Sequence, residues 1–529
     1  MHRCRRKSRA ALLLAVGSLS FAVTTKAQVS YFWQGEPTST HGGSGSWETT
    51  NTEWSSLGSS GAADHVWQND GLERANFGIT PGTVNISVPF VVVNGMNFNT
   101  GGYIITGAGT ISWAGGNVNI GNGNTGTIST QIGGAGTFTK IGLGTVVLDG
   151  NNNFTNGLTA SVGTLILNGN NSFSGGLTVT GGTVSLTNAN TFTGGMSISG
   201  GGTVIGMAQA SGSPFGDTTA PVSLDTSVLR LTGIAANTVT TIGDLTIAGQ
   251  SFSGTGASNV IIDNTAGNGG GFTTTLAAGN LIRGGQGAVL AITPESATLG
   301  AGAQVTFSNG NSLLTNGMLP AWIVGATPNV DFLTHDGNGV ATVTYTSTDL
   351  TTSTSSDIVN QSSAPTITGN VNAYALKTNQ AINLDNNVLT LGNGSGQTGL
   401  ILNSGGSITN GTVNFGNTEG MVYLQGTTTL GSTGKNIVSN GLTITASGLS
   451  NLTLAGKVVN GSAATKLIIN EATSGSGLAM SDANSYTGGT ALNVNTGSTG
   501  TVSIGNDTAF GSGKVSVTVS TPQLLASGG

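Results

Sequence analysis

Three consecutive segments of the chain share one pattern: NNNFTNGLTASVGTLILNG (residues 151–169), NNSFSGGLTVTGGTVSLTN (170–188) and ANTFTGGMSISGGGTVIG (189–206). Phe154, Phe173 and Phe192 stand nineteen residues apart, in a chain of which only 5% of the residues are aromatic. Each segment holds two short runs in which apolar and polar residues alternate, as in a β-strand with one buried face. Gly and Asn, which tolerate the positive φ of tight corners, separate these runs. The period predicts a repeated β-structure with one aromatic side chain per unit.

A single unit has too few apolar side chains to form a core, but stacked units bury them against their equivalents about 4.8 Å away. We therefore predict an all-β fold, a parallel β-helix or β-solenoid with coils of roughly 19 residues, an N-terminal cap and an irregular central insertion. Phe173 should have an aromatic neighbour on each side, and Asn, Ser and Thr should line the outside. A string of antiparallel hairpins would explain the alternation, but not the return of one residue type at one phase.

The N-terminus has the organisation of a cleaved signal peptide. Basic residues from Arg3 to Arg9 precede an apolar run, Ala10 to Val23, and a small-residue site ends at Ala27. We expect export, with residues 1–27 removed and no transmembrane segment in the mature chain. The single cysteine, Cys4, would leave with this peptide, so we expect no disulfide framework and no thiolate metal site.

The charge balance argues against a nucleic acid partner. Charged residues make up 7% of the chain. Six of the 15 Lys and Arg residues lie in residues 1–27, so nine remain against 21 Asp and Glu, a net charge of about −12. A surface of this sign repels phosphate backbones.

The repeat resembles the autotransporter-associated β-strand repeat, also called the passenger-associated transport repeat. The resemblance is carried by the stretches NTFTGGMSI (190–198), GGTVI (201–205), SPFGDTTAPVSL (213–224), NSYTGGTALNV (484–494) and GTVSIGNDTAFGSGKVSV (500–517). Asn190, Phe192 and the pair Gly194-Gly195 recur as Asn484, Tyr486 and the pair Gly488-Gly489.

The resemblance implies a surface or secreted β-helical passenger, extracellular or at the cell surface of a bacterium and adhesin-like in function, with surface glycans or other cells as partners. Two features depart from the family pattern. The later copy has five extra residues between its aromatic residue and the next Gly-Thr pair. The chain also ends in STPQLLASGG without the strands of a membrane barrel, so we expect an outer-membrane translocator, if there is one, to lie outside this chain.

Composition divides the chain into five parts. We expect a signal peptide (1–27), a Trp-rich N-terminal cap with the first coils (28–115), a β-solenoid whose tandem repeats are clearest at 137–206 (116–300), an irregular insertion or protruding subdomain (301–365), and a continuing solenoid with a terminal repeat at 482–518 (366–529). The Trp-rich part holds five of the six tryptophans: Trp33, Trp47, Trp54, Trp67 and Trp113. They suit a cap over the apolar end of the solenoid, and the alternative is an exposed platform that stacks on sugars.

An enzyme built on a β-solenoid needs carboxylates, alone or beside Arg or Lys, on one face of neighbouring coils. Between residues 137 and 206 the only charged residues are Lys140 and Asp149, and the mature histidines, His41, His65 and His335, are scattered. We therefore assign no catalytic, cofactor-binding or metal-binding residue and expect a protein that is not an enzyme. The alternative is a carbohydrate-binding or polysaccharide-degrading protein with its site in 28–115 or 301–365, where Trp322, His335 and Asp336 lie.

Two short motifs carry no cofactor assignment. GNGNTG, residues 121–126, matches the dinucleotide fingerprint by its letters, but a chain with 89 glycines contains such matches by chance and no helix is predicted after it. HDGNG, from His335 to Gly339, is typical of a turn.

Overall fold

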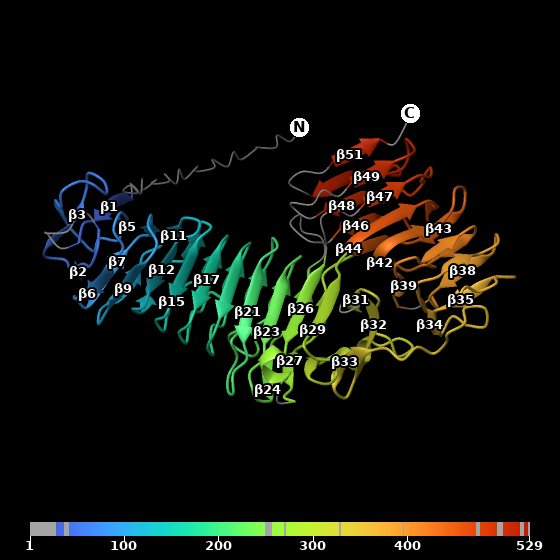
Figure 1. Ribbon diagram of the computed structural model, residues 1–529, viewed down its shortest axis with the longest axis horizontal. Coiled ribbons are helices and arrows are strands. Elements are labelled where there is room, and N and C mark those ends of the chain that lie inside the picture. Colours follow the sequence, from blue (N-terminus) through green and yellow to red (C-terminus); the bar gives the residue numbers. More distant parts are fainter. Residues whose placement is uncertain are drawn as a thin grey trace, which may run out of the picture.

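The computed structural model of the chain describes residues 28–35, 42–248, 257–268, 271–326, 330–394, 396–471, 477–494, 501–518 and 523–526. These residues form two stacks of β-strands, shown in Figure 1 from blue to yellow-green and from orange to red. The first stack contains sheets 1 to 4, and the second stack contains sheets 5 and 6, as defined below. The all-β solenoid predicted from the sequence is confirmed.

Sheets 1 and 3 belong to the first stack. Sheet 1 consists of β1 (Val29–Trp33), β3 (Thr52–Ser55), β4 (His65–Val66), β5 (Glu73–Phe77), β8 (Met96–Phe98), β11 (Asn117–Ile120), β14 (Phe138–Ile141), β16 (Leu158–Ala160), β18 (Leu177–Val179), β20 (Met196–Ile198), β22 (Val222–Leu224), β25 (Leu245–Ile247) and β28 (Leu281–Arg283). Sheet 3 consists of β7 (Phe90–Val93), β10 (Thr110–Trp113) and β13 (Ile132–Gly133).

Sheets 2 and 4 complete the first stack. Sheet 2 consists of β2 (Gly45–Trp47), β6 (Thr83–Ile86), β9 (Tyr103–Gly107), β12 (Thr125–Ile128), β15 (Thr145–Leu148), β17 (Thr164–Leu167), β19 (Thr183–Leu186), β21 (Thr203–Met207), β23 (Val228–Thr232), β26 (Ser258–Asp263), β29 (Leu290–Glu295), β31 (Ile323–Gly325), β32 (Asp331–Asp336) and β33 (Gly339–Thr342). Sheet 4 consists of β24 (Thr238–Ile242), β27 (Thr274–Ala278) and β30 (Ala303–Phe307). A one-turn helix, α1 (Thr265–Asn268), follows β26, and a 3-10 turn, η1 (Gly310–Leu313), follows β30.

The second stack contains sheets 5 and 6. Sheet 5 consists of β34 (Ile358–Gln361), β36 (Ala375–Thr378), β37 (Ala381–Asn383), β39 (Thr398–Leu402), β40 (Ser407–Thr409), β42 (Gly420–Leu430), β44 (Leu442–Leu454), β46 (Leu467–Glu471), β47 (Gly477–Met480), β48 (Thr490–Val494), β49 (Thr501–Ile504), β50 (Val515–Thr518) and β51 (Gln523–Ala526). Sheet 6 consists of β35 (Val371–Ala373), β38 (Val388–Leu391), β41 (Thr412–Asn414), β43 (Asn436–Ser439) and β45 (Lys457–Asn460).

The nineteen-residue period is the register of the tandem repeats in the first stack. Thr145 pairs with Thr164 and Thr164 with Thr183, so each of these coils places the same residue directly over its equivalent. The tandem-repeat strands of sheet 2 follow the burial pattern that the alternation predicts: in β17, Leu165 and Leu167 are buried while Thr164 and Ile166, which alternate with them, are partly exposed. At the corners, Gly163 and Gly182 both have φ of +70°, a conformation that only glycine adopts without strain.

A column of phenylalanine rings runs through the interior of these coils. The centroids of Phe154 and Phe173 lie 6.0 Å apart, and those of Phe173 and Phe192 lie 4.8 Å apart with their planes 2° from parallel. All three rings are buried. Phe173 therefore has the two aromatic neighbours that the sequence predicts. Phe154 also has two, because Phe138, which lies outside the nineteen-residue phase, packs against it at 5.4 Å.

A second interior column consists of asparagines, so the expectation that Asn lines the outside is wrong for these residues. Asn152 donates from Nδ2 to Oδ1 of Asn171, and Asn171 donates in the same way to Asn190, both at 2.9 Å. Each Oδ1 also accepts a backbone N–H from the preceding coil, as in Asn171 N–H to Asn190. Because every amide is bonded above and below, burial of these polar groups is tolerated.

The N-terminal end of the first stack is closed by an antiparallel cap. β3 pairs antiparallel with β1 and β4, whereas the coils that follow pair in parallel. Trp33, Trp47, Trp54 and Trp67 are buried together, with ring centroids 4.7 to 5.1 Å apart for the closest pairs. Phe77 packs against this cluster and connects it to the first parallel coil.

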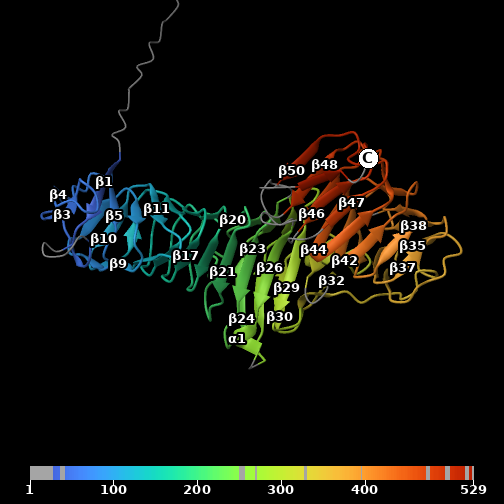
Figure 2. The ribbon, with the colours of Figure 1, turned by 45° about the horizontal axis from the view of Figure 1, so that its top comes forward.

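The other end of the first stack also ends in antiparallel pairs. β30 and β31 still pair in parallel with β27 and β29, but β31, β32 and β33 form an antiparallel meander. The chain then enters the second stack at β34, which pairs in parallel with β36. Figures 1 and 2 both show sheet 5 lying against the region of β29 and β31, so the second stack folds back beside the first.

Candidate functional surfaces

The tryptophans that the sequence offered as a sugar platform do not form one. Trp33, Trp47, Trp54, Trp67 and Trp113 are each 0–1% exposed, so no face of these rings is available for stacking. The cap interpretation explains Trp33, Trp47, Trp54 and Trp67, whose rings fill the end of the core. Trp113 lies further along the stack, where its ring packs on Phe138. Trp322 is 4% exposed, and its ring lies beneath the guanidinium of Arg283 at 5.6 Å.

The histidines are held in separate structural contacts. His65 Nε2 lies 2.6 Å from the buried carboxylate of Glu73, and its ring stacks on Tyr31 at 3.6 Å. His335 lies at the opposite end of the first stack, where Nε2 accepts the N–H of Phe307 and Nδ1 contacts Asn311 Oδ1 at 2.8 Å. Burial lowers the pKa of His335, which favours the neutral ring that these contacts require. His41 lies outside the described residues.

The short motifs are turns and strands. Asp336 accepts the N–H of Asn338 within the tight connection from β32 to β33, so HDGNG is a hairpin turn. GNGNTG is followed by the rest of β12 rather than by a helix, and it offers no helix N-terminus to a pyrophosphate. Asp149 accepts hydrogen bonds from Ser129 Oγ and Asn168 Nδ2 on the neighbouring coils.

Lys140 is the buried cation of the repeat region. It occupies an inward position of β14, in register with Ala160, and its Nζ donates to the carbonyls of Gly142 and Val162, the latter at 2.8 Å. Burial without a carboxylate partner lowers the pKa of Lys140 to about 8. The side chain is 0% exposed, so this amine is not available to a ligand in solution.

The structure assembles one Arg–carboxylate cluster that the sequence did not reveal. Arg230 on β23 binds Asp263 at the end of β26 and Glu295 at the end of β29, with N–O distances of 2.7 Å and 2.5 Å. These residues lie on one face of three neighbouring coils, which is the placement expected of a β-solenoid enzyme. Asp263 and Glu295 lie 33 and 65 residues after Arg230 in the sequence. These spacings do not match the nineteen-residue period, so the sequence did not indicate that the three side chains meet.

The electrostatics of this cluster do not favour proton transfer. Burial raises the pKa of Asp263, but hydrogen bonds from Thr265 and Arg230 outweigh it and leave the pKa below its ordinary value. A general acid must hold a proton near neutral pH, which requires a raised pKa. One guanidinium binds both carboxylates, so the geometry is that of a clasp joining three coils.

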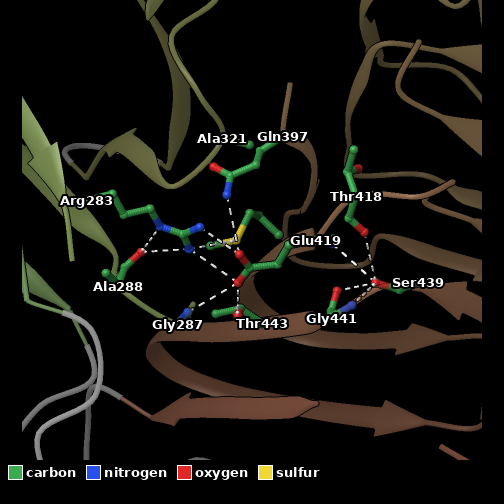
Figure 3. Close-up of polar contacts among 12 residues, drawn as sticks. Arg283, Gly287, Ala288, Ala321, Gln397, Thr418, Glu419, Ser439, Gly441 and Thr443 are labelled. Atoms are coloured by element: carbon green, nitrogen blue, oxygen red, sulfur yellow. Dashed lines mark hydrogen bonds and ion pairs between the residues drawn. The ribbon is translucent and has the colours of Figure 1, made fainter. Parts of the chain in front are cut away.

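A second ion pair joins the two stacks (Figure 3). Arg283, at the end of β28, contacts Glu419 of the second stack at 2.6 Å. The same carboxylate accepts hydrogen bonds from the N–H of Gly287 at 3.3 Å and from Thr443 Oγ1 at 2.6 Å. Gln397 Nε2 completes its surroundings at 3.4 Å. Both charged side chains are largely buried, with 13% and 8% of their surface exposed.

Further contacts extend this interface along sheet 5. Tyr423 donates its hydroxyl to the carbonyl of Ala321 at 2.6 Å, and Asn470 donates to the carbonyl of Gly287 at 3.3 Å. Lys377 binds Asp331 at 2.8 Å. Ile401, Met421 and Tyr423 pack into the core of the first stack rather than that of the second. We call this set of contacts the elbow.

Within the described residues, no group of three or more His, Cys, Asp or Glu side chains is arranged to hold a metal ion. No helix in the same part of the chain combines the length and the apolar composition needed to cross a membrane.

Comparison with known proteins identifies the family of the repeat. Residues 138–165, 160–186 and 181–205 match the Passenger-associated-transport-repeat family, so the chain carries three tandem copies of this repeat, as its sequence indicated. The Adhesin BmaC autotransporter of Brucella suis biovar 1 (strain 1330) is 35% identical over 150 residues, which is 28% of this chain and 4% of that relative. The chain therefore matches only a small part of the relative's length. No solved structure matches the chain.

Proposed function

We propose that the chain is a non-catalytic, exported passenger that acts at the cell surface or in the extracellular medium as an adhesin-like structural protein. The observation that carries the proposal is the tandem repeat itself, which matches the passenger-associated family over residues 138–205 and stacks residue on residue in sheets 1 and 2. The relative named as an adhesin autotransporter supports the same role. Surface glycans or other cells are the partners we propose.

The five parts of the chain follow from this role. Residues 1–27 direct export, residues 28–115 close the end of the solenoid, and the coils on either side of residues 301–365 present the surface. The closed Arg230–Asp263–Glu295 clasp and the buried tryptophans support a structural rather than a catalytic protein.

Export is tested by expressing the full chain in a bacterium that recognises its leader, followed by fractionation and N-terminal sequencing. We expect extracellular or surface-bound protein beginning at or near Gln28. Extracellular protein that retains Met1 would contradict the cleavage, and protein confined to the cytoplasm would contradict the proposed role.

Adhesion is tested separately, by comparing cells that display the chain with cells that display only residues 28–115. We expect attachment to host or bacterial cells to need the coils after residue 115, because these form most of the surface of the two stacks. Equal attachment by both forms would show that the coils are not the adhesive surface.

A further inference from the structure

Sheet 1 carries a line of free hydroxyl groups on its outer face. Thr178, Ser197, Ser223 and Thr246 occupy the same outward position in β18, β20, β22 and β25 and pair directly in register. In the described part of the chain none of these four hydroxyls forms a hydrogen bond to the protein, and all are at least partly exposed. We call these four residues the hydroxyl ladder.

The hydroxyl ladder forms part of the wall of a groove. A hollow of about 150 Å³ is lined by its four residues together with Gly194 and Pro221, among others. Pro221 also lines a second hollow of about 670 Å³, and most of the other residues that line it lie in sheet 4 and in the turns that follow its strands, among them Thr241, Ala277 and Ser308. Residues of successive coils line both hollows, β18 to β25 in the smaller one and β24, β27 and β30 in the larger one, so the two hollows together run across the strands, along the axis of the first stack.

The composition of the groove selects a neutral ligand. Asp244 is the only charged residue among those that line the two hollows, and its Oδ1 already accepts the N–H of Asn280. A groove without cations does not retain a nucleic acid or an acidic polysaccharide. It also cannot bind a peptide by strand addition, because the main chain of β18 to β25 already pairs on both sides.

We infer that this groove binds a neutral, hydroxyl-rich polysaccharide chain that lies parallel to the stack axis. The inference rests on the proposed surface role and names its ligand class and its site. Hydroxyl groups recur every coil, about 4.8 Å, so alternate members of the ladder lie about 9.6 Å apart. One disaccharide of an extended 1,4-linked glycan has nearly this length, so successive disaccharides meet equivalent hydroxyls.

The groove predicts how the affinity should depend on chain length. Each sugar meets single hydroxyls, and the aromatic residue of the groove, Phe307, is 3% exposed and offers no stacking face. Individual contacts are therefore weak, and affinity must come from several equivalent contacts along one chain. A hexasaccharide should bind far more tightly than a disaccharide.

The test measures binding of the purified mature chain to cello- and chito-oligosaccharides of two, four and six sugars by titration calorimetry. A triple variant, Thr178→Val, Ser197→Ala and Ser223→Ala, removes three hydroxyls of the ladder. Its matched control is Thr164→Val, Thr183→Val and Thr203→Val, which removes the equivalent outward line from sheet 2. We expect the ladder variant to bind hexasaccharide at least tenfold more weakly, and the control to bind as the unmodified chain does.

Two measurements keep the test decisive. Thermal unfolding of both triple variants should match that of the unmodified chain, and Ser197→Ile, which fills the smaller hollow at an exposed strand position, serves if the triple variant is unstable. The inference is overturned if no oligosaccharide binds, if the ladder and control variants lose binding equally, or if a disaccharide binds as tightly as a hexasaccharide. Cell attachment that persists without oligosaccharide binding would overturn this inference and leave the proposed function standing.

Discussion

The aromatic residue at a fixed phase of the repeat has a physical reason at the scale of single side chains. A coil of nineteen residues encloses little space, and one ring per coil fills the corner between sheets 1 and 2 only if the next ring lies against it. The asparagine two positions earlier supplies the polar counterpart, because its amide bonds the coils above and below. The N-x-F pattern thus specifies register through one apolar and one polar column.

Replacing Phe173 by Ala should destabilise the coils around it. The ring is 1% exposed and has aromatic neighbours on both sides, so we expect a cost of about 3–5 kcal/mol, the range for a buried Phe. Hydrogen exchange should show loss of protection confined to the nearby coils, since coils contact only their neighbours. Phe90→Ala, at a ring that is 50% exposed, is the control and should change little. Uniform loosening of the whole chain would contradict stacking.

Lys140 should make the stability of the repeat region rise with pH. Its pKa is about 8 in the folded chain and 10.5 in the unfolded chain, so the unfolded state binds more protons between these values. The penalty for burying the charged amine is fully present below pH 8 and is relieved as the pH rises toward 10.5. Chemical denaturation at pH 7 and pH 9.5 measures this, and Lys140→Met should remove this rise. A variant with the same pH dependence as the unmodified chain would contradict the assignment.

At the scale of strands and coils, the Arg230 clasp joins coils that are longer than those of the tandem repeats. In the tandem repeats, nineteen residues separate paired strands, whereas Val228 pairs with Asn259 and Asn259 with Ala291. The longer coils also contain the strands of sheet 4. The Arg230 clasp forms ion pairs across three of these coils, whereas residues 138–205, all of which the structure describes, form none.

Arg230→Met should destabilise this region most at neutral pH. The pKa of Asp263 is lowered in the folded state, so its contribution to stability is present above the pKa of an unfolded aspartate and is lost as the pH falls through the folded value. Removing Arg230 leaves Asp263 with little exposure and no cation, a change that costs on the order of 3 kcal/mol for a buried partner and less for one that is partly exposed. Chemical denaturation at pH 7 and pH 3 should show a large difference between variant and unmodified chain at pH 7 and a small one at pH 3. Equal differences at both pH values would show that the clasp is not electrostatic.

The sequence predicted those features that recur with a period. Phe173, the Gly163 corner and the alternation in β17 are local or repeated, so they could be read without a structure. The Arg230 clasp and the Arg283–Glu419 pair could not, because each joins residues of irregular coils that share no phase. The sequence did contain one further signal. The stretches TGLIL (398–402) and GMVYL (420–424) lack the alternation of apolar and polar residues, which is typical of strands covered on both faces, and all of these residues in β39 and β42 are buried.

At the scale of the whole molecule, the elbow determines the shape. The outer face of sheet 5 packs on the C-terminal coils of the first stack, so the solenoid that the sequence predicts is divided into two stacks that meet there (Figures 1 and 2). Buried tyrosine and aliphatic side chains supply the contact area, and the Arg283–Glu419 pair fixes the position of one stack on the other.

Glu419→Gln should loosen the elbow while leaving each stack folded. The variant keeps the shape of the side chain but leaves Arg283 as a buried cation without its carboxylate, which costs about 3–5 kcal/mol at a fully buried pair. Hydrogen exchange should increase at Gly287 and Thr443, which contact Glu419, and stay unchanged at Thr164. Glu48→Gln in the N-terminal cap is the matched control. Unchanged exchange at the elbow would show that apolar packing alone holds the stacks together.

The central claim, that one coil follows another in register along a common axis, is tested most directly by distances between spin labels. The outward line of sheet 2 runs from Thr125 through Thr203 to Asn259, four and six strand spacings from its start. Cysteines introduced at Thr125 and Thr203 should give a label separation near 19 Å, and those at Thr125 and Asn259 a separation near 29 Å, each within a few ångströms. Residues 28–529 contain no native cysteine, so a protein produced from Gln28 onward carries labels only at the introduced positions. Two distances that differ by about 10 Å agree with the stacked solenoid, and equal distances, or a shorter one for the more distant pair, would contradict it.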